Sequence, residues 1–238
     1  MANHLTSFPE GGLALVVGAT GGIGSALVQA LDVSGRFEGV LKVSRNSSPA
    51  VDIVEEASVR ALAGTVSDSG LPLRLVIDAT GFLHDETYRP ERSWRHIEPE
   101  HLHYSFLVNA VGPALLMKHL LPLLPRQGKA ALATLSARVG SIEDNGYGGW
   151  YAYRASKAAL NQLVRTAAIE LSRRWPEAIC TALHPGTVDT RLTAPFSKQG
   201  LNVRSPEEAA VDLIKVIDEL TVAQNGSFLD YRGNKISW

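Results

Sequence analysis

Short apolar runs recur along the chain, and they lack the polar alternation of a strand with one exposed face. An unbroken apolar run indicates a strand that is buried on both sides, as in a parallel sheet covered by helices. Six such runs occur, at Leu13–Val17, Gly39–Val43, Leu73–Ala79, Ala130–Leu135, Ala178–Leu183 and, more weakly, Ser227–Tyr231. We therefore expect a mainly parallel sheet.

The stretches between these runs are longer and carry the apolar spacing of helices. We expect helices at Gly22–Val33, Glu55–Val66, His101–Leu124, Tyr153–Arg174 and Pro206–Leu220. The last has a clear start, because Ser205 suits the N-cap and Pro206 suits the first helical position. Strand and helix alternate without a repeat or a linker, which indicates the α/β class. The prediction is one domain over residues 1–238, a doubly wound parallel sheet with helices on both faces.

Two segments lack this regularity. Residues 82–100 are dense in charged and aromatic side chains, and residues 191–204 hold Pro195 and Gly200 with little periodicity. Both follow the carboxyl ends of expected strands, where open α/β sheets bind ligands. For each segment, substrate contact and a solvated loop are both open.

Composition narrows the possible roles. A hydrophobic share of 45% among the 238 residues excludes a disordered chain. The 23 basic and 24 acidic residues give a formal charge of -1, so nothing attracts nucleic acid or anionic membranes in general. The first residues show no signal-peptide pattern. We expect a cytoplasmic protein without a nucleic-acid or membrane partner.

Features that could indicate a membrane span, a reactive thiol, a metal site or a hydrolase are each better explained in another way or incomplete. The uncharged residues 11–31 are long enough to cross a bilayer, which needs about 20 residues, but clustered glycines at their middle favour a strand, a turn and a helix. Cys180 lies in an apolar run, which favours a core residue over a reactive thiol. His96, His101 and His103 have no Cys or carboxylate at zinc spacing, so no metal is expected. No Gly-x-Ser-x-Gly elbow offers a hydrolase nucleophile.

A glycine-rich turn joins the first expected strand to the first expected helix, and its sequence is Gly18-Ala19-Thr20-Gly21-Gly22-Ile23-Gly24. Backbone N–H groups in such a turn can approach a pyrophosphate, whose charge the helix N-terminus also favours. No Lys-Ser/Thr follows the last glycine, which excludes a P-loop. The turn indicates a dinucleotide.

The end of the second expected strand bears on which dinucleotide is bound. An NAD enzyme places a carboxylate there for the ribose 2′-hydroxyl, whereas this chain has Ser44 and then Arg45. A guanidinium can bind a 2′-phosphate. NADP(H) is therefore favoured over NAD(H), with a merely solvated Arg45 as the alternative.

A tyrosine and a lysine begin the long Ala-rich helix. Tyr153 and Lys157 are four residues apart and share one helix face. A free phenol has a pKa of about 10, and a nearby ammonium favours its ionised form. The pair suits proton transfer near neutral pH. Tyr147 and Tyr151 have no lysine four residues on.

The order of these motifs resembles the short-chain dehydrogenase/reductase family. After the glycine turn come Asp78-Ala79-Thr80-Gly81, Asn109 in a helix, Ser136 at a strand end, the Tyr153/Lys157 pair and Pro185-Gly186-Thr187-Val188-Asp189-Thr190. The phrase LSARVGSIEDNGYGGWYAYRASKAALNQL is similar to the bacterial C-factor-like branch, which is similar to small carbonyl reductases. The resemblance covers nearly the whole chain and implies a Rossmann-type fold.

The resemblance implies roles for individual residues. Tyr153 would give a proton to the substrate oxygen while hydride leaves the nicotinamide, and Lys157 would lower the Tyr153 pKa and hold the nicotinamide ribose. Asn109 would hold a proton-relay water, and Asp52 would meet the adenine amino group. The implied cofactor-binding residues are Gly18, Thr20, Gly22, Ile23, Gly24, Arg45, Asp52, Ile53, Ala79, Thr80, Gly81, Tyr153, Lys157, Pro185, Gly186, Val188 and Thr190.

Two departures from the family pattern stand out. Asp78 and Thr80 replace residues of the family's Asn-Asn-Ala-Gly, although Gly81 is retained. Ala137 falls where the family has its substrate-binding serine. The hydroxyl could come from Ser136 or from Ser141, and it would hydrogen-bond the carbonyl oxygen. Ser141 is slightly favoured, because a slip of one residue turns a strand side chain to the other face.

Taken with the residues, the resemblance implies an NADP(H)-dependent oxidoreductase that reduces a small aldehyde or ketone, or oxidises the matching alcohol. The equivalent helices of the resembled family pair across subunits, so a homodimer or homotetramer is expected. The alternative is a C-factor-type signalling or regulatory protein that holds the nucleotide with little or no catalysis. Ala137 favours this alternative, and the complete set of Tyr153, Lys157 and Asn109 opposes it.

Overall fold

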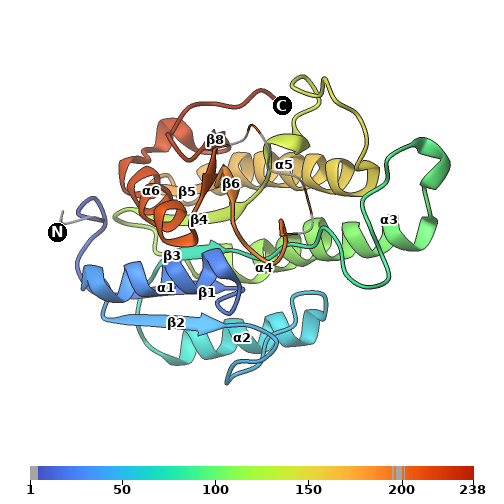
Figure 1. The fold of residues 1–238 in the computed structure, drawn as a ribbon. Helices are drawn as coiled ribbons and strands as arrows, with labels where there is room; N and C mark the ends of the chain where they lie inside the picture. The colour runs from blue at the N-terminus through green and yellow to red at the C-terminus, as the bar shows by residue number, and fades with distance from the viewer. Residues whose placement is uncertain (1–4, 195, 197–199, 201) are drawn as a thin grey trace.

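The computed structural model describes residues 5–194, 196, 200 and 202–238. Its centre is a parallel sheet of six strands in the order β2-β1-β3-β4-β5-β8 (Figure 1). The strands are β1 (Leu13–Val17), β2 (Gly39–Val43), β3 (Leu73–Asp78), β4 (Ala130–Leu135), β5 (Ala178–His184) and β8 (Phe228–Asp230). The prediction of six parallel strands is confirmed, and five of them are largely buried, whereas in the edge strand β2 only Val43 is buried. The strand order reverses between β1 and β3, the kind of point where ligands bind in open α/β sheets.

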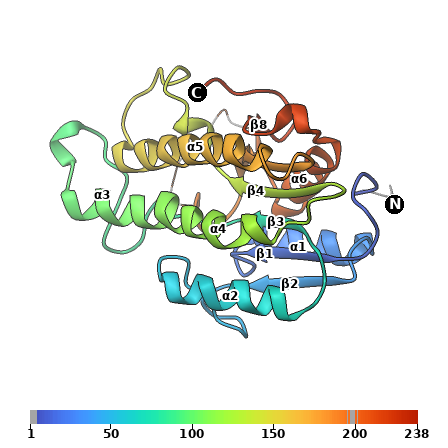
Figure 2. The ribbon, with the colours of Figure 1, turned by 180° about the vertical axis from the view of Figure 1, so that it is seen from behind.

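Helices cover both faces of the sheet, as Figures 1 and 2 show from opposite sides. On one face lie α1 (Gly22–Ser34) and α6 (Pro206–Glu219), and on the other lie α2 (Glu56–Asp68), α4 (Gly112–Leu120) and α5 (Tyr151–Ser172). The predicted doubly wound architecture is therefore confirmed. The predicted cap of α6 is also present, since Ser205 Oγ accepts the Glu208 N–H at 3.1 Å and Glu208 Oε2 accepts the Ser205 N–H at 2.9 Å.

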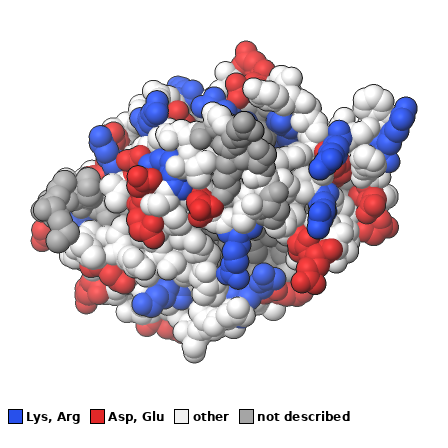
Figure 3. Space-filling model, viewed as in Figure 1, with Lys and Arg blue, Asp and Glu red and all other residues white. Residues whose placement is uncertain are grey.

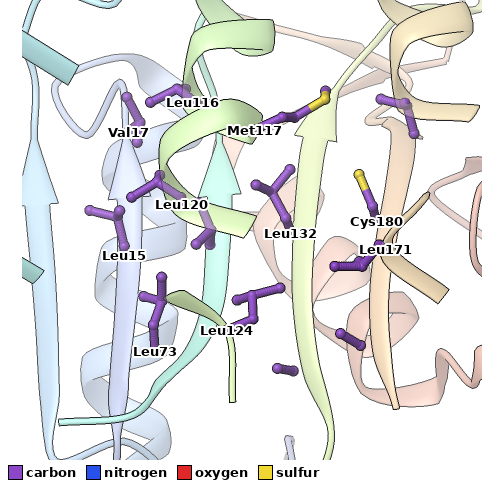
Figure 4. Close-up of a cluster of buried hydrophobic side chains, with 14 of the residues drawn as sticks. Leu15, Val17, Leu73, Leu116, Met117, Leu120, Leu124, Leu132, Leu171 and Cys180 are labelled. Carbon is purple, nitrogen blue, oxygen red and sulfur yellow. The ribbon is translucent and has the colours of Figure 1, made fainter. Parts of the chain in front are cut away.

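The core divides into two layers because successive residues of a strand point to opposite faces. Leu15 and Val17 pack with α2, α4 and α5, whereas Ala14 and Val16 pack with α1 and α6. Figure 4 shows the first layer, in which the Cys180 side chain lies among leucines. Cys180 is 0% exposed, and burial raises the pKa of its thiol to about 12. The thiol is thus a core group, as the sequence suggested.

The expected long helix at 101–124 is divided. It consists of α3 (Pro99–Phe106), a π-helical turn (Leu107–Val111), α4 and the short 3₁₀ helix Leu121–Leu123. Pro113 has no N–H for the regular α pattern. The Gly112 N–H instead bonds to the Leu107 carbonyl, five residues back. Such π turns often occur at functional sites.

The remaining elements are short. They are the two-stranded sheet of β6 (Thr187–Val188) and β7 (Val203–Arg204), with 3₁₀ helices at Trp94–His96, Arg138–Gly140 and Val222–Gln224. The segment 191–204 lies partly outside the described residues. One helical run, Pro99–Leu123, is long and apolar enough to span a membrane by composition. In the fold this run packs against α5 and α2, as a core helix does.

Candidate active site

The predicted site residues gather at the carboxyl edge of the sheet, beginning with the turn between β1 and α1. Gly18 has φ +82°, a conformation that favours glycine. Its N–H and that of Ala19 both donate to the Val43 carbonyl, at 2.9 and 3.1 Å. A Cβ on Gly24 would lie 2.2 Å from the Gly18 carbonyl oxygen. The turn is therefore closed on its own backbone, and a side chain at Gly24 would force it open.

The N-terminus of α1 is suited to an anion. Its N-cap residue Gly21 supplies no side-chain hydrogen bond, and the first turn holds no acidic residue. The first N–H groups of a helix lack partners inside the helix and carry a partial positive charge. Thr190 lies against this turn, because a Cβ on Gly22 would be 2.9 Å from Thr190 Cγ2. Glycines and helix end together form a cradle that fits a pyrophosphate.

The end of β2 and the residues after it lie beside the glycine turn. Ser44 is buried and its hydroxyl accepts the Asn46 N–H at 3.2 Å, whereas Arg45 is exposed. Asp52 is half-buried, and its Oδ1 accepts the Val54 N–H at 3.2 Å. Ile53 is buried against Gly112, where a Cβ would lie 2.6 Å from its Cδ1. An exposed guanidinium thus stands where a carboxylate would select NAD(H).

The Asp78–Gly81 segment follows β3. The Asp78 carboxylate is 1% exposed. It accepts the Thr80 N–H at 3.0 Å, the Thr80 hydroxyl at 2.6 Å and the Thr134 hydroxyl at 2.7 Å. Ala79 packs under the glycine turn, since a Cβ on Gly18 would be 3.0 Å from its carbonyl. The two residues that depart from the family pattern, Asp78 and Thr80, are therefore hydrogen-bonded to each other. Asp78 also joins β3 to β4 through Thr134.

Asn109 and Lys157 flank Gly81. A Cβ on Gly81 would lie 3.7 Å from Asn109 Oδ1 and 3.8 Å from Lys157 Nζ. Asn109, in the π turn, accepts the Phe82 N–H at 2.8 Å and donates to the Phe82 carbonyl at 2.8 Å and to Ser156 Oγ at 3.1 Å. Its side chain is therefore fixed from three sides.

Lys157 is 3% exposed, and its Nζ donates to the Leu135 carbonyl at 2.8 Å. Burial lowers the pKa of this amine to about 8, although the nearby Asp78 carboxylate opposes the shift. An amine with that pKa is charged at neutral pH and loses its charge in a mildly basic solution. Lys157 is thus a titratable group within the working range of an enzyme.

Tyr153 lies in the first turn of α5 and is 8% exposed. Burial raises the pKa of its phenol above the ordinary value of 10.0. The expectation that Lys157 lowers this pKa is not what this structure gives, because desolvation dominates at Tyr153. The phenol is therefore protonated at neutral pH, as a proton donor must be.

The two candidate serines are both buried and both engaged. Ser136 Oγ donates to Asn161 Oδ1 on α5 at 2.7 Å. Ser141 Oγ accepts the Asp144 N–H at 3.1 Å and lies 3.4 Å from the Trp238 carbonyl. Among the described residues, neither hydroxyl has a hydrogen bond to Tyr153. Ala137 is half-buried, with the extended backbone of φ -142° and ψ 145°.

The segment after β5 completes this edge. Gly186 has φ +82°, and a Cβ there would lie 3.1 Å from the Tyr231 ring. Pro185 accepts a hydrogen bond from Arg204 at 3.3 Å, and Val188 is buried in β6. Burial and the Arg138 charge lower the pKa of His184 to about 4, so its imidazole is neutral. Among the described residues, its Nδ1 is the one buried side-chain polar atom without a partner.

Sequence reasoning missed an aromatic group next to Tyr153. Trp150 packs edge-on to Tyr153 with ring centroids 6.1 Å apart, and Phe196 lies 5.1 Å beyond. His84 contacts Phe196 at 5.2 Å, and its Nε2 lies 3.1 Å from the Leu192 carbonyl. The segments 82–100 and 191–204 thus meet beside Tyr153. No spacing in the sequence predicts this contact, because it joins three distant parts of the chain.

His101, one of the three histidines considered above as metal ligands, has a carboxylate partner. His101 Nδ1 pairs with Glu91 Oε1 at 3.2 Å. Within the described part of the chain, no group of three or more His, Cys, Asp or Glu side chains could hold a metal ion. Charged side chains of both signs are interspersed over the face in Figure 3, in keeping with the net charge of -1.

Comparison with known proteins identifies the family of this chain. A profile of the short chain dehydrogenase family matches residues 12–200. The chain is 32% identical to the 1-hydroxy-2-glutathionyl-2-methyl-3-butene dehydrogenase of Rhodococcus sp. (strain AD45), over 94% of this chain and 98% of that protein. It is 36% identical to the C-signal of Myxococcus xanthus over 56% of this chain and 76% of that protein.

Solved structures show the same fold over almost the whole length. The NADPH-bound carbonyl reductase from chicken fatty liver superposes with a TM-score of 0.84 at 25% identity, covering 99% of this chain and 98% of that one. The carbonyl reductase Sniffer of D. melanogaster gives a TM-score of 0.82 at 24% identity, covering 96% and 100%. With its glycine turn and its Tyr153, Lys157 and Asn109 in the family order, this chain belongs to the short-chain dehydrogenase family and is an oxidoreductase of that family.

Proposed function

We propose that this protein is an NADP(H)-dependent reductase of a small aldehyde or ketone, able to oxidise the matching alcohol in the reverse direction. The observation that carries the proposal is that a buried lysine and a fixed asparagine flank Gly81, with the buried Tyr153 one helical turn before the lysine on α5. Loss of NADPH absorbance with a panel of aldehydes, ketones and quinones tests it. Tight NADPH binding without turnover of any of them would contradict it.

The residues at the carboxyl edge of the sheet would have separate roles in binding and catalysis. The glycine turn and the N-terminus of α1 would hold the pyrophosphate, and Thr190 would close over it. When bound, the nicotinamide supplies the hydride. Tyr153 would donate its phenolic proton to the substrate oxygen as negative charge develops there. Lys157 would supply a positive charge and a donor near the ribose, while Asn109 would hold a water for proton return.

The oxygen of the substrate needs a second donor besides Tyr153. Ser136 or Ser141 would supply it by exchanging its present partner, and replacing each by Ala separately distinguishes them. The serine that contributes is the one whose loss slows reduction by about tenfold.

Arg45→Ala should remove the preference for NADPH over NADH. Arg45 is exposed at the end of β2, with no acidic residue at Ser44, so its guanidinium is free to bind the 2′-phosphate. Such a charge-assisted contact contributes about 1.5–3 kcal/mol, or roughly a tenfold to hundredfold difference in affinity. Fluorescence titrations with both cofactors measure it. Exposed Arg60 on α2 offers a control, since Arg60→Ala should leave the NADPH/NADH ratio unchanged.

The rate of reduction should fall above a pH of about 8, by roughly tenfold per unit, because Lys157 loses its charge there. A loss of stability caused by the titration of Lys157 would not explain this fall in rate. The folded pKa of Lys157 is lowered, so the unfolded chain binds more protons above pH 8 and the contribution of Lys157 to stability rises with pH. A pH profile of kcat/KM, with the unfolding midpoint measured at each pH, checks that the rate falls while the contribution of Lys157 to stability rises. A profile that stays flat to pH 10 would contradict the role of Lys157.

The aromatic group suggests which side of the site receives the substrate. Trp150, Phe196 and His84 would form an apolar wall beside Tyr153, so we infer that the carbonyl carries an apolar or planar substituent. The charged surface of 82–100 would face solvent around it.

We infer a homodimer or homotetramer through α4 and α5, and the α5 residues Leu163 and Ile169, which are 36% and 46% exposed, would lie at that interface. Light scattering after size-exclusion chromatography measures this state. We also infer a cytoplasmic location and a small-molecule partner rather than nucleic acid or membrane.

A second function is favoured by one comparison. The similarity to C-signal supports a signalling or regulatory protein that holds the nucleotide. The Ala at position 137 agrees with it, whereas the complete Tyr153, Lys157 and Asn109 set supports catalysis. The turnover panel separates the two, because a regulatory protein would bind NADPH and consume none.

A further inference from the structure

The helix that carries Tyr153 begins in an unusual way. Its N-cap residue, Trp150, has φ 54° and ψ 44°, and its own side chain caps nothing. The first N–H groups of any helix need partners from elsewhere. A helix of 22 residues whose first turn holds the proton donor therefore depends on some other group to fix its start.

Glu91 supplies those partners from 61 positions earlier in the chain. Both of its carboxylate oxygens accept the Ala152 N–H, each at 3.2 Å. Its backbone carbonyl accepts the Trp150 N–H at 2.6 Å. A negative charge at a helix N-terminus is favoured by the helix dipole. One residue thus holds both the start of α5 and the tryptophan that packs on Tyr153.

The Glu91 side chain is itself held in place. It is 1% exposed and pairs with His101 Nδ1 at 3.2 Å. The His101 ring stacks on Tyr88, with centroids 5.0 Å apart and planes 3° from parallel, and Phe82 packs edge-on at 6.2 Å. The Phe82 backbone is bonded in turn to Asn109. A continuous set of contacts therefore joins Asn109 to the start of α5 through the segment 82–100.

We propose that Glu91 is a positioning residue, which fixes the first turn of α5 and thereby the place of the Tyr153 phenol relative to Asn109 and Lys157. This inference rests on the proposed function, in which Tyr153 is the proton donor. The alternative is a cap that stabilises the fold and leaves the rate per folded molecule unchanged. The Glu91 carboxylate binds the N–H of Ala152, the residue directly before Tyr153. A small displacement of this turn therefore moves the phenolic oxygen of Tyr153.

Two variants separate these roles. Glu91→Ala removes the acceptor, and Glu91→Gln keeps an acceptor oxygen of the same reach without the charge. We expect Glu91→Ala to lower kcat at least about tenfold with NADPH affinity changed less than about threefold, and Glu91→Gln to recover most of that rate. Amide hydrogen exchange of residues 150–157 should accelerate in Glu91→Ala and return toward the wild-type rate in Glu91→Gln. If Glu91→Ala does not fold, the partial loss in Glu91→Gln and its exchange carry the test.

Thr221→Ala is the matched control. Thr221 caps the short helix Val222–Gln224 far from Tyr153 in the sequence, through its hydroxyl and the Ala223 N–H at 3.3 Å. It should lower the unfolding midpoint without changing kcat. Full kcat in Glu91→Ala, or an equal loss in Thr221→Ala, would overturn the proposal. Hydrogen exchange needs no turnover, so a wild type without any activity would refute the proposed function while the exchange still tests the cap.

Discussion

Tyr153→Phe should lower kcat by about 10³-fold and leave NADPH affinity within a factor of about two, since general acid catalysis typically contributes about 10²–10⁴. The substitution removes only the hydroxyl from a side chain that is 8% exposed, so packing against Trp150 is kept. The phenol is protonated at neutral pH because burial raises its pKa. Steady-state reduction of a responsive carbonyl, with a fluorescence titration of NADPH, measures both quantities.

Tyr151→Phe provides a control in the same turn of α5. Tyr151 is half-buried and has Ala155 four residues on, where Tyr153 has Lys157. The Tyr151→Phe variant should keep a kcat within about twofold of the wild type, because Tyr151 has no lysine one helical turn further on. An unimpaired Tyr153→Phe enzyme would refute the assigned proton donor, whereas equal losses in both variants would indicate a general effect on the helix start.

The sheet and the glycine cradle were predictable because each depends on residues close together in the sequence. An unbroken apolar run such as Leu13–Val17 can be satisfied only between two layers, and all five of its residues are buried. Gly18 and Gly24 follow that strand at a spacing that the closed turn requires. Tyr153 and Lys157 lie one helical turn apart for the same local reason.

Contacts between distant segments could not be predicted in this way. The Glu91 carboxylate and the Ala152 N–H are brought together only by the path of the chain between 82 and 100. Trp150 contacts Phe196 because two loops meet beside Tyr153. The π turn at Asn109 lies next to Pro113, and the sequence does not show which hydrogen bonds replace those of a regular α-helix there.

The source of the substrate-binding hydroxyl depends on more than the alternation of side chains along β4. Side chains alternate along β4, so Leu132 packs with α5 and Ala133 packs with α1 and α6. Ser136 continues the Leu132 face, which explains why its hydroxyl reaches Asn161 on α5 at 2.7 Å. The same alternation favours Ser141 from the sequence, and in the structure the Ser141 hydroxyl accepts the Asp144 N–H within the 141–144 turn. The substrate-binding hydroxyl therefore depends on which of these bonds a bound carbonyl replaces.

Gly24→Ala should weaken NADPH binding by about 100-fold. The added Cβ would lie 2.2 Å from the Gly18 carbonyl oxygen, 2.9 Å from its carbon and 3.2 Å from Ala19 Cα. All three are backbone atoms that cannot rotate away, so the turn has to open and the N–H groups of α1 shift from the phosphates. Overpacking of this kind costs about 1–3 kcal/mol, and the upper end corresponds to roughly 100-fold in affinity. Isothermal titration with NADPH measures the change.

Gly64→Ala is the control for adding the same methyl group to a helix. Gly64 is exposed on α2 and has nothing within 4 Å of its added Cβ. Its variant should keep the wild-type NADPH affinity and gain about 0.5–1 kcal/mol of stability, because alanine loses less conformational entropy than glycine in a helix. Unchanged NADPH affinity in a folded Gly24→Ala protein would show that the phosphates bind elsewhere than on this turn, since the turn cannot keep its shape around the new methyl group.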